Sequence, residues 1–109
     1  MNYTKKEREE YTEQRRRNCE RLGITKNEYN ALRRIGQALQ KCYTDNCNGA
    51  YQTEEAYNHA AEPLEYQAKE YAGKLGYKVY LQTDPRGATI YLDKVERSGA
   101  DYNRGTCIY

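Results

Sequence analysis

Four cysteines and a single histidine carry the most reactive side chains of this chain, and their spacing decides whether they can form a site. Cys42, Cys47, His59 and Cys107 supply, on paper, the ligands of a Cys3His zinc site. Structural zinc sites usually contain close Cys-x2-Cys pairs, and this chain has none. We therefore predict that these cysteines and Cys19 are reduced thiols. We predict no metal site and no cofactor.

Patterns typical of catalysis are missing from the sequence. It contains no glycine-rich phosphate loop, no H-E-x-x-H and no G-x-S-x-G. Local spacing places no nucleophile or carboxylate beside His59, so a surface or hydrogen-bonded histidine is the simpler interpretation. We predict that the protein is not an enzyme.

Residues 82–91, QTDPRGATIY, combine turn chemistry with a strand pattern. Asp84 suits the first position of a type I turn, Pro85 presets φ at the second, and Gly87 permits a left-handed exit. These features predict the tip of a β-hairpin.

The residues that flank this tip select one register. With a four-residue loop at 84–87, Leu81 faces Ile90 and Tyr80 faces Tyr91. A three-residue loop would pair Leu81 with Tyr91 and mix the two faces, which is disfavoured where one face is buried. The hairpin is therefore predicted to have an aliphatic face, formed by Tyr77, Val79, Leu81, Ile90 and Leu92. Its other face is polar and carries Lys78, Tyr80, Gln82, Thr89, Tyr91 and Asp93.

The polar face of the hairpin is the predicted binding surface. Its two tyrosines form an aromatic platform on which a base can stack, with Arg86 at the tip placed for a phosphate. Tyrosine and arginine are equally typical of protein-interface hot spots. Two alternatives stay open: the C-terminal segment covers this face, and Asp84 and Arg86 serve only the turn. The predicted binding residues are Tyr80, Gln82, Asp84, Arg86 and Tyr91.

The elements that carry this hairpin follow from capping boxes and hydrophobic spacing. We expect helices at residues 4–21, from Thr25 to about residue 42, and at residues 53–75, the third bent or divided near Pro63. The end of the chain, residues 106–109, has β propensity and is expected to add a third strand. The predicted fold is α+β: a single domain, residues 1–109, with a helical part at 4–75 packed on a small antiparallel sheet at 77–109.

Two helical surfaces have functional and ordinary interpretations. The run Arg15, Arg16 and Arg17 is a secondary basic patch for phosphate or an acidic partner, or else a solvated helix face. The first two helices are compatible with a helix-turn-helix or an ordinary αα-hairpin. In the helix-turn-helix, the groove-facing residues would be Lys26, Asn27, Asn30, Arg33 and Arg34.

Composition limits the classes of function. The net charge is +2, too close to neutral for a general nucleic-acid-binding domain. The chain has thirteen tyrosines and neither Phe nor Trp, so tyrosine is expected to form part of a thin core. No apolar run reaches membrane-spanning length, and the first residues do not resemble a signal peptide. We expect a cytoplasmic protein with no membrane partner.

The segment QTDPRGATIYLD resembles a strand-DPRG-strand motif of small tailed-phage accessory proteins of unknown function. The resemblance covers residues 75–93 and, more loosely, YNRGTCIY at the C-terminus. It implies a non-catalytic protein in the host cytoplasm that binds and inhibits or modulates a host protein, as in anti-defence. The alternative is a protein that binds or sequesters a nucleotide or single-stranded nucleic acid through the tyrosines and Arg86.

Overall fold

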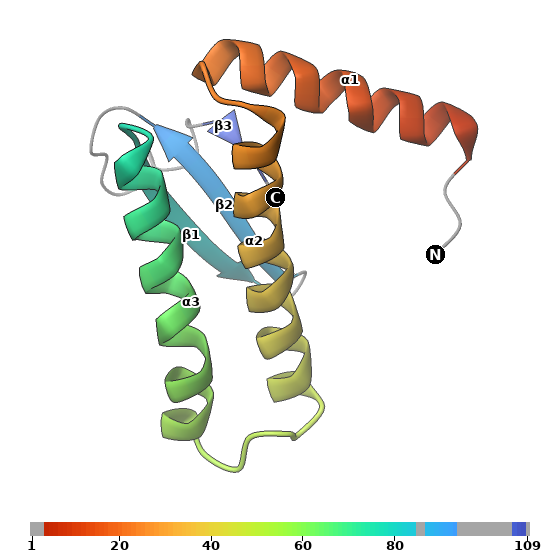
Figure 1. Ribbon diagram of the computed structural model, residues 1–109. Helices are drawn as coiled ribbons and strands as arrows, with labels where there is room; N and C mark the ends of the chain where they lie inside the picture. Colours follow the sequence, from red (N-terminus) through yellow and green to blue (C-terminus); the bar gives the residue numbers. More distant parts are fainter. Residues whose placement is uncertain (1–3, 85–86, 94–105, 109) are drawn as a thin grey trace.

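The computed structural model describes residues 4–84, 87–93 and 106–108, which form a layer of helices on a small sheet (Figure 1). Within these residues the order of elements is helix, helix, helix, strand, strand, strand, which confirms the α+β prediction. The sheet is antiparallel with strand order β1-β2-β3. The elements are α1 (Lys5–Leu22), α2 (Lys26–Cys47), α3 (Glu54–Lys74), β1 (Lys78–Asp84), β2 (Gly87–Asp93) and β3 (Thr106–Cys107).

Threonines begin all three of these helices, as predicted. The hydroxyl of Thr4 accepts a hydrogen bond from the Glu7 amide at 3.1 Å. At Thr25 the capping box is complete, because the Glu28 carboxylate also accepts from the Thr25 amide at 2.8 Å. Each cap satisfies an amide that has no partner inside the helix. The hydroxyl of Thr53 caps α3 in the same way.

Helix α3 passes through Pro63 without dividing, so the alternative of two separate helices is wrong. Proline removes one amide, and thereby one hydrogen bond to the carbonyl four residues earlier, which belongs to His59. Both Pro63 and His59 are exposed. Water can therefore hydrate the carbonyl at this position, while Ala61 and Ala68 on the other side of α3 remain buried.

The hairpin has the predicted register. Tyr80 pairs with Tyr91, and Leu81 pairs with Ile90. The pairing continues to Asp84 and Gly87, one pair closer to the tip than the predicted ladder. The predicted third strand is present, since β3 pairs with β2 and the Ile108 amide donates to the Ile90 carbonyl at 2.8 Å.

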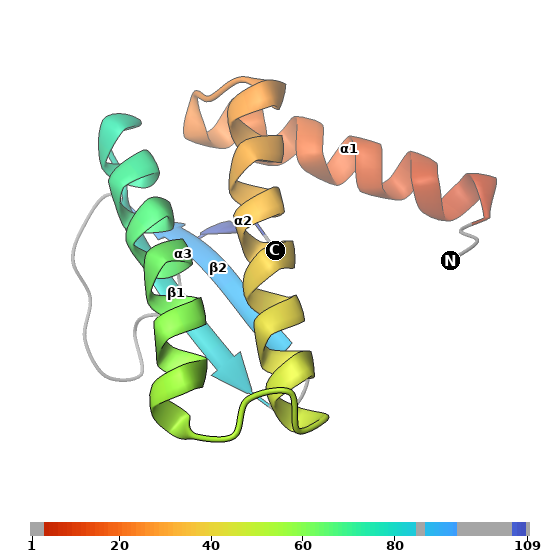
Figure 2. The ribbon, with the colours of Figure 1, turned by 60° about the horizontal axis from the view of Figure 1, so that its bottom comes forward.

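The core lies between the aliphatic face of the sheet and the two helices α2 and α3, which both cross that face (Figure 2). Ile90 and Leu92 of β2 are almost completely buried there, together with Leu32 of α2 and Ile108. Burying a side chain of this size contributes roughly 1.5–3 kcal/mol. Tyrosine shares this core as expected, because Tyr29 and Tyr77 are also buried. The remaining members of this cluster are Leu22, Ile24 and Ala72.

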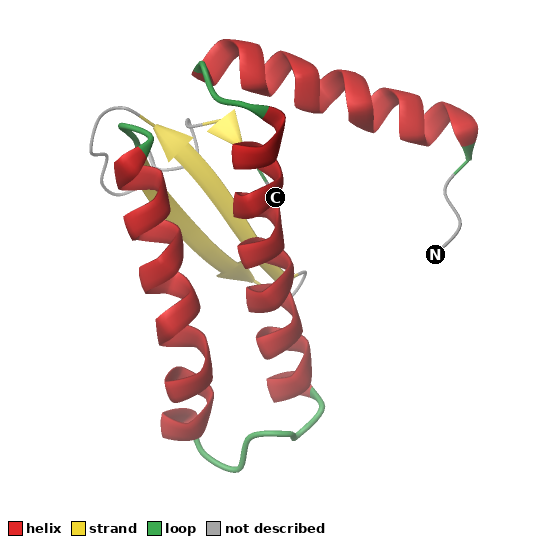
Figure 3. Cartoon of the chain, in the orientation of Figure 1, coloured by secondary structure: helices red, strands yellow, loops and turns green. Residues whose placement is uncertain are grey.

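Buried side chains attach helix α1 to this body near its C-terminal end. It ends at Gly23, which adopts the left-handed φ of 68°. The buried Tyr77 hydroxyl donates a hydrogen bond to the Leu22 carbonyl, which joins the end of α1 to the residue preceding β1. Residues 4–12 are all exposed. Figures 1 and 3 show the helix leaving the start of α2 and projecting away from the helix-sheet body.

Candidate binding surfaces

The predicted hairpin surface is described only in part. Tyr80 and Tyr91 are half-buried and lie opposite each other. Their neighbours Ile90 and Leu92 point into the core, and successive side chains of a strand alternate between faces. The two tyrosines therefore lie on the sheet face turned away from α2 and α3. Gln82 and Asp84 belong to β1, and Arg86 lies outside the described residues.

The C-terminal segment, which is the alternative cover for this face, includes strand β3. Strand β3 lies beside β2, with Cys107 paired to Tyr91. It thus extends the sheet at its edge, while the buried Ile108 side chain joins the core. Residues 94–105, the other part of the segment proposed to cover the tyrosines, lie outside the described residues.

The four residues of the considered zinc set occupy separate elements. Cys42 and Cys47 belong to the second half of α2, His59 is exposed on α3, and Cys107 is exposed on β3. Among the described residues, no group of three His, Cys, Asp or Glu side chains is placed to hold a metal ion. Cys19 is half-buried, and this burial raises the pKa of its thiol.

The three consecutive arginines of α1 do not form one surface. Arg16 donates to the Glu13 carboxylate at 2.7 Å and to Glu20 at 2.8 Å, and Arg17 donates to Glu13 at 3.2 Å. The hydrogen bond from Arg16 holds the pKa of the Glu13 carboxyl at about 2, well below its ordinary value. Arg15 instead turns towards α2. The predicted basic patch is thus divided. Arg16 and Arg17 form ion pairs on the outer side of α1, whereas Arg15 lies on the inner side, which faces α2.

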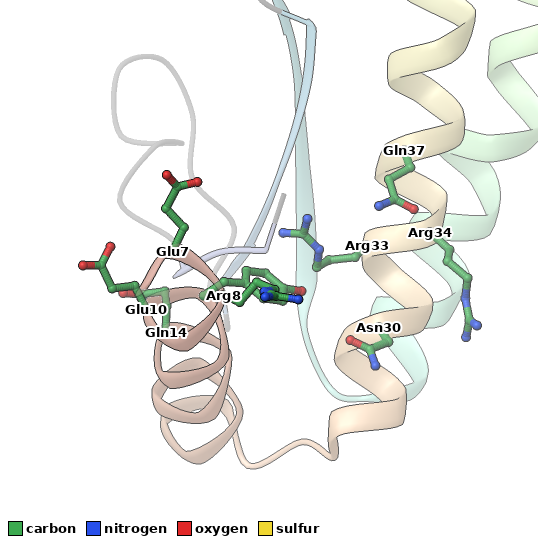
Figure 4. A pocket seen from close by; sticks show the side chains of 9 residues that line it. Glu7, Arg8, Glu10, Gln14, Asn30, Arg33, Arg34 and Gln37 are labelled. Atoms are coloured by element: carbon green, nitrogen blue, oxygen red, sulfur yellow. The ribbon is translucent and has the colours of Figure 1, made fainter. Parts of the chain in front are cut away.

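A cleft of about 820 Å³ separates α1 from α2 (Figure 4). Its α1 wall comes from the exposed N-terminal half of the helix. Figure 4 shows Arg8 directed towards α2 and Arg33 directed back towards α1, whereas Glu7 and Glu10 point away from the space between the helices. The lining residues are Glu7, Arg8, Glu10, Tyr11, Gln14, Asn30, Arg33, Arg34 and Gln37.

Two guanidinium groups lie near the ring of Tyr11 in this cleft. The guanidinium carbon of Arg33 is 4.7 Å from the centre of the Tyr11 ring, and that of Arg15 is 5.4 Å away. Both distances fall within the range of cation–π attraction. Arg15 also donates to the Asn30 side-chain oxygen at 3.4 Å. Tyr11, which is 36% exposed, is therefore held in place while part of its surface still faces solvent.

Asn18 anchors α1 below this cleft. It is buried to 6% exposure, and its amide nitrogen donates at 3.3 Å to the Tyr29 hydroxyl of α2 and at 3.3 Å to the Cys107 carbonyl of β3. Its side-chain oxygen accepts from Gln14 at 3.2 Å. Arg33 adds a bond from α2 to the Ile108 carbonyl at 3.3 Å. Sequence reasoning did not identify Asn18, although it lies one helical turn before Leu22 on the inner side of α1.

The helix-turn-helix interpretation requires the side of α2 that carries Asn30 and Arg33 to be open to a DNA groove. In the structure that side faces α1. Asn30 accepts from Arg15, and Arg33 lies over Tyr11. Lys26 and Asn27 are exposed in the first turn of α2. This geometry favours the αα-hairpin interpretation over a DNA-reading helix.

Comparison of the chain with protein-family models, curated proteins and solved structures found no match. Among the described residues, none of the helices combines the length and the apolar character needed to cross a membrane.

Proposed function

We propose that this chain is a non-catalytic binding protein that holds a protein partner in the cleft between α1 and α2. The observation that carries the proposal is the exposure of the N-terminal half of α1. Isolated helices shorter than about 12–15 residues are marginal in water, and most helices in proteins are stabilised by packing an apolar face. The buried residues of α1 are Asn18 and Leu22, both in its second half. The first half instead forms one wall of a cleft, as expected for a helix that completes its packing on a partner.

The composition of the cleft supports a protein as the partner. Tyrosine and arginine are the residue types that dominate binding energy at protein interfaces. Tyr11 and Arg33 are already positioned by mutual contact, which reduces the entropy lost on binding. The resemblance to tailed-phage accessory proteins adds a context, in which the partner is a host protein and binding inhibits or modulates it as an anti-defence measure.

The tyrosine face of the hairpin is a second candidate surface. It is favoured by the pairing of Tyr80 with Tyr91 on the side of the sheet away from the helices. The same pair suits the alternative function, in which the protein binds a nucleotide or single-stranded nucleic acid by stacking. Binding of an oligonucleotide that weakens with added salt and is lost in Tyr80→Ala would favour that alternative.

Site-specific cross-linking tests the cleft. A photoreactive residue replaces Gln37 in the cleft or, as a matched control, Glu62 on the exposed side of α3. After irradiation in host-cell extract, we expect a defined protein adduct from position 37 and none from position 62. Unlabelled wild-type protein should compete for the adduct, and Tyr11→Ala should not. Identical adducts from both positions, or equal competition by Tyr11→Ala, would contradict the proposal.

A further inference from the structure

We infer that the cleft between α1 and α2 binds an acidic peptide segment, whose carboxylates contact the arginines while an apolar side chain packs against the exposed part of Tyr11. This inference rests on the proposed function and specifies the chemistry of the partner. The charged side chains that line the cleft point in different directions according to their sign. Arg8 and Arg33 point towards the space between the helices, and Glu7 and Glu10 point away from it (Figure 4). Positive groups that face the space between the helices favour a negatively charged ligand there.

The guanidinium groups beside Tyr11 also have a geometry that suits a carboxylate. Arg15 and Arg33 both lie over the ring of Tyr11, at 5.4 Å and 4.7 Å from its centre. Stacking engages the flat face of a guanidinium, whereas its N–H donors lie along the edge in a fork that matches a carboxylate. Arg15 gives one donor to the Asn30 oxygen, and its other N–H groups can bind a carboxylate while its guanidinium stacks on Tyr11. The contact with Tyr11 also limits the rotamers of both long side chains before a ligand arrives.

The outer side of α1 differs from the side that faces the cleft. Arg16 and Arg17 are neutralised there by Glu13 and Glu20. The helix thus pairs its outer arginines within itself and directs Arg8 and Arg15 to the inner side. A phosphate-rich nucleic acid would engage basic groups over a wider surface. The local charge of this cleft, beside a partly exposed aromatic ring, fits a short acidic segment better.

Fluorescence anisotropy with defined probes tests this inference. The probe is a labelled twelve-residue peptide of alternating Glu and Leu, and its control has Gln at every Glu position. We expect saturable binding of the acidic peptide that weakens as salt rises, and at least tenfold weaker binding of the Gln peptide. In Arg8→Gln the affinity for the acidic peptide should fall about tenfold. Arg21→Gln is the matched control: it removes the same charge from an exposed position on α1 outside the cleft, and should leave the affinity unchanged.

Four outcomes separate the inference from the proposed function. Equal binding of both peptides, or equal losses in Arg8→Gln and Arg21→Gln, would overturn the inference, as would tighter binding of a single-stranded oligonucleotide. If the acidic peptide fails to compete with a protein cross-linked from position 37, the acidic chemistry is wrong and the proposed function stands. Circular dichroism of each variant verifies that it is folded.

Discussion

In the body of the protein, made of α2, α3 and the sheet, the contacts join fully buried aliphatic side chains, whereas α1 contributes one buried aliphatic side chain, Leu22, and is attached mainly through polar groups. Leu32, Ile90 and Leu92 illustrate the first kind, with relative exposures of 0%, 0% and 1%. Asn18 illustrates the second, because it bonds both the Tyr29 hydroxyl and the Cys107 carbonyl.

This difference explains why the cleft can exist. Apolar contacts are non-directional and draw surfaces together until they are densely packed. Hydrogen bonds fix a few atoms at defined distances and directions. Because α1 is anchored by such bonds near its C-terminal end, its N-terminal half can stand away from α2. Tyr11 and the two arginines beside it then bridge part of the gap.

The largest expected effect is in the body. Leu32→Ala should lower the free energy of unfolding by about 2–5 kcal/mol, because it removes a fully buried side chain and leaves a cavity. Urea denaturation measures the loss. Gln37→Ala, an exposed change on the same helix, should remain within about 0.5 kcal/mol of wild type. A loss below about 1 kcal/mol for Leu32→Ala would show that the body can repack.

Asn18→Ala should destabilise the protein by about 1–3 kcal/mol, since it removes hydrogen bonds to the buried Tyr29 hydroxyl and to the part-buried Cys107 carbonyl. The more informative readout is amide hydrogen exchange. Amides of α1 should lose protection, while those of α2 and α3 keep theirs, because separate parts of a protein can open independently. Equal loss of protection in α1 and α2 would show that both regions unfold as one unit.

Arg33→Lys should have a smaller effect, about 1 kcal/mol or less. Lysine keeps the charge but lacks the planar group that stacks on Tyr11 and the forked donors that reach the Ile108 carbonyl. Nuclear magnetic resonance should show altered Tyr11 ring signals and increased exchange in the first half of α1. Arg34→Lys, at an exposed position whose side chain points away from α1 in Figure 4, is the control and should change neither.

The smallest effect concerns the outer ion pairs of α1. The folded-state pKa of Glu13 is about 2, against an ordinary value of 4.5. A depressed carboxyl pKa stabilises the folded state fully above the ordinary value, and this contribution disappears as the pH falls through the folded value. Thermal unfolding of Glu13→Gln should therefore differ slightly from wild type at pH 7 and converge with it near pH 2. Because the pair is exposed, added salt should reduce the difference; a difference that persists in acid would contradict this assignment.

The parts of the fold that were predictable depend on local patterns. The register of the hairpin follows from the alternation around residues 84–87, and the buried side of α2 follows from helical spacing of Tyr29, Leu32 and Leu39. Continuity through Pro63 was not predictable, since it depends on that position facing solvent.

Local sequence patterns could not predict the cleft between α1 and α2. Its shape depends on the angle between α1 and α2, which is set by contacts of Asn18 with Tyr29 and Cys107. A polar residue in a helix usually indicates a solvent-exposed side. The sequence context of Asn18 therefore gave no indication that this residue is buried. Arg33 was considered only as a DNA-contacting residue, and its partner Tyr11 lies in another helix.

The bond between Asn18 and Cys107 has a consequence for the order of events during synthesis. Its two residues are 89 positions apart, and Arg33 reaches a carbonyl 75 positions further along. Strand β3 follows α1 in the chain, so the bond from Asn18 to Cys107 can form only after β3 has been made, whereas the bond from Asn18 to Tyr29 needs only α2. The full anchoring of α1 is therefore completed only when β3 has joined the sheet.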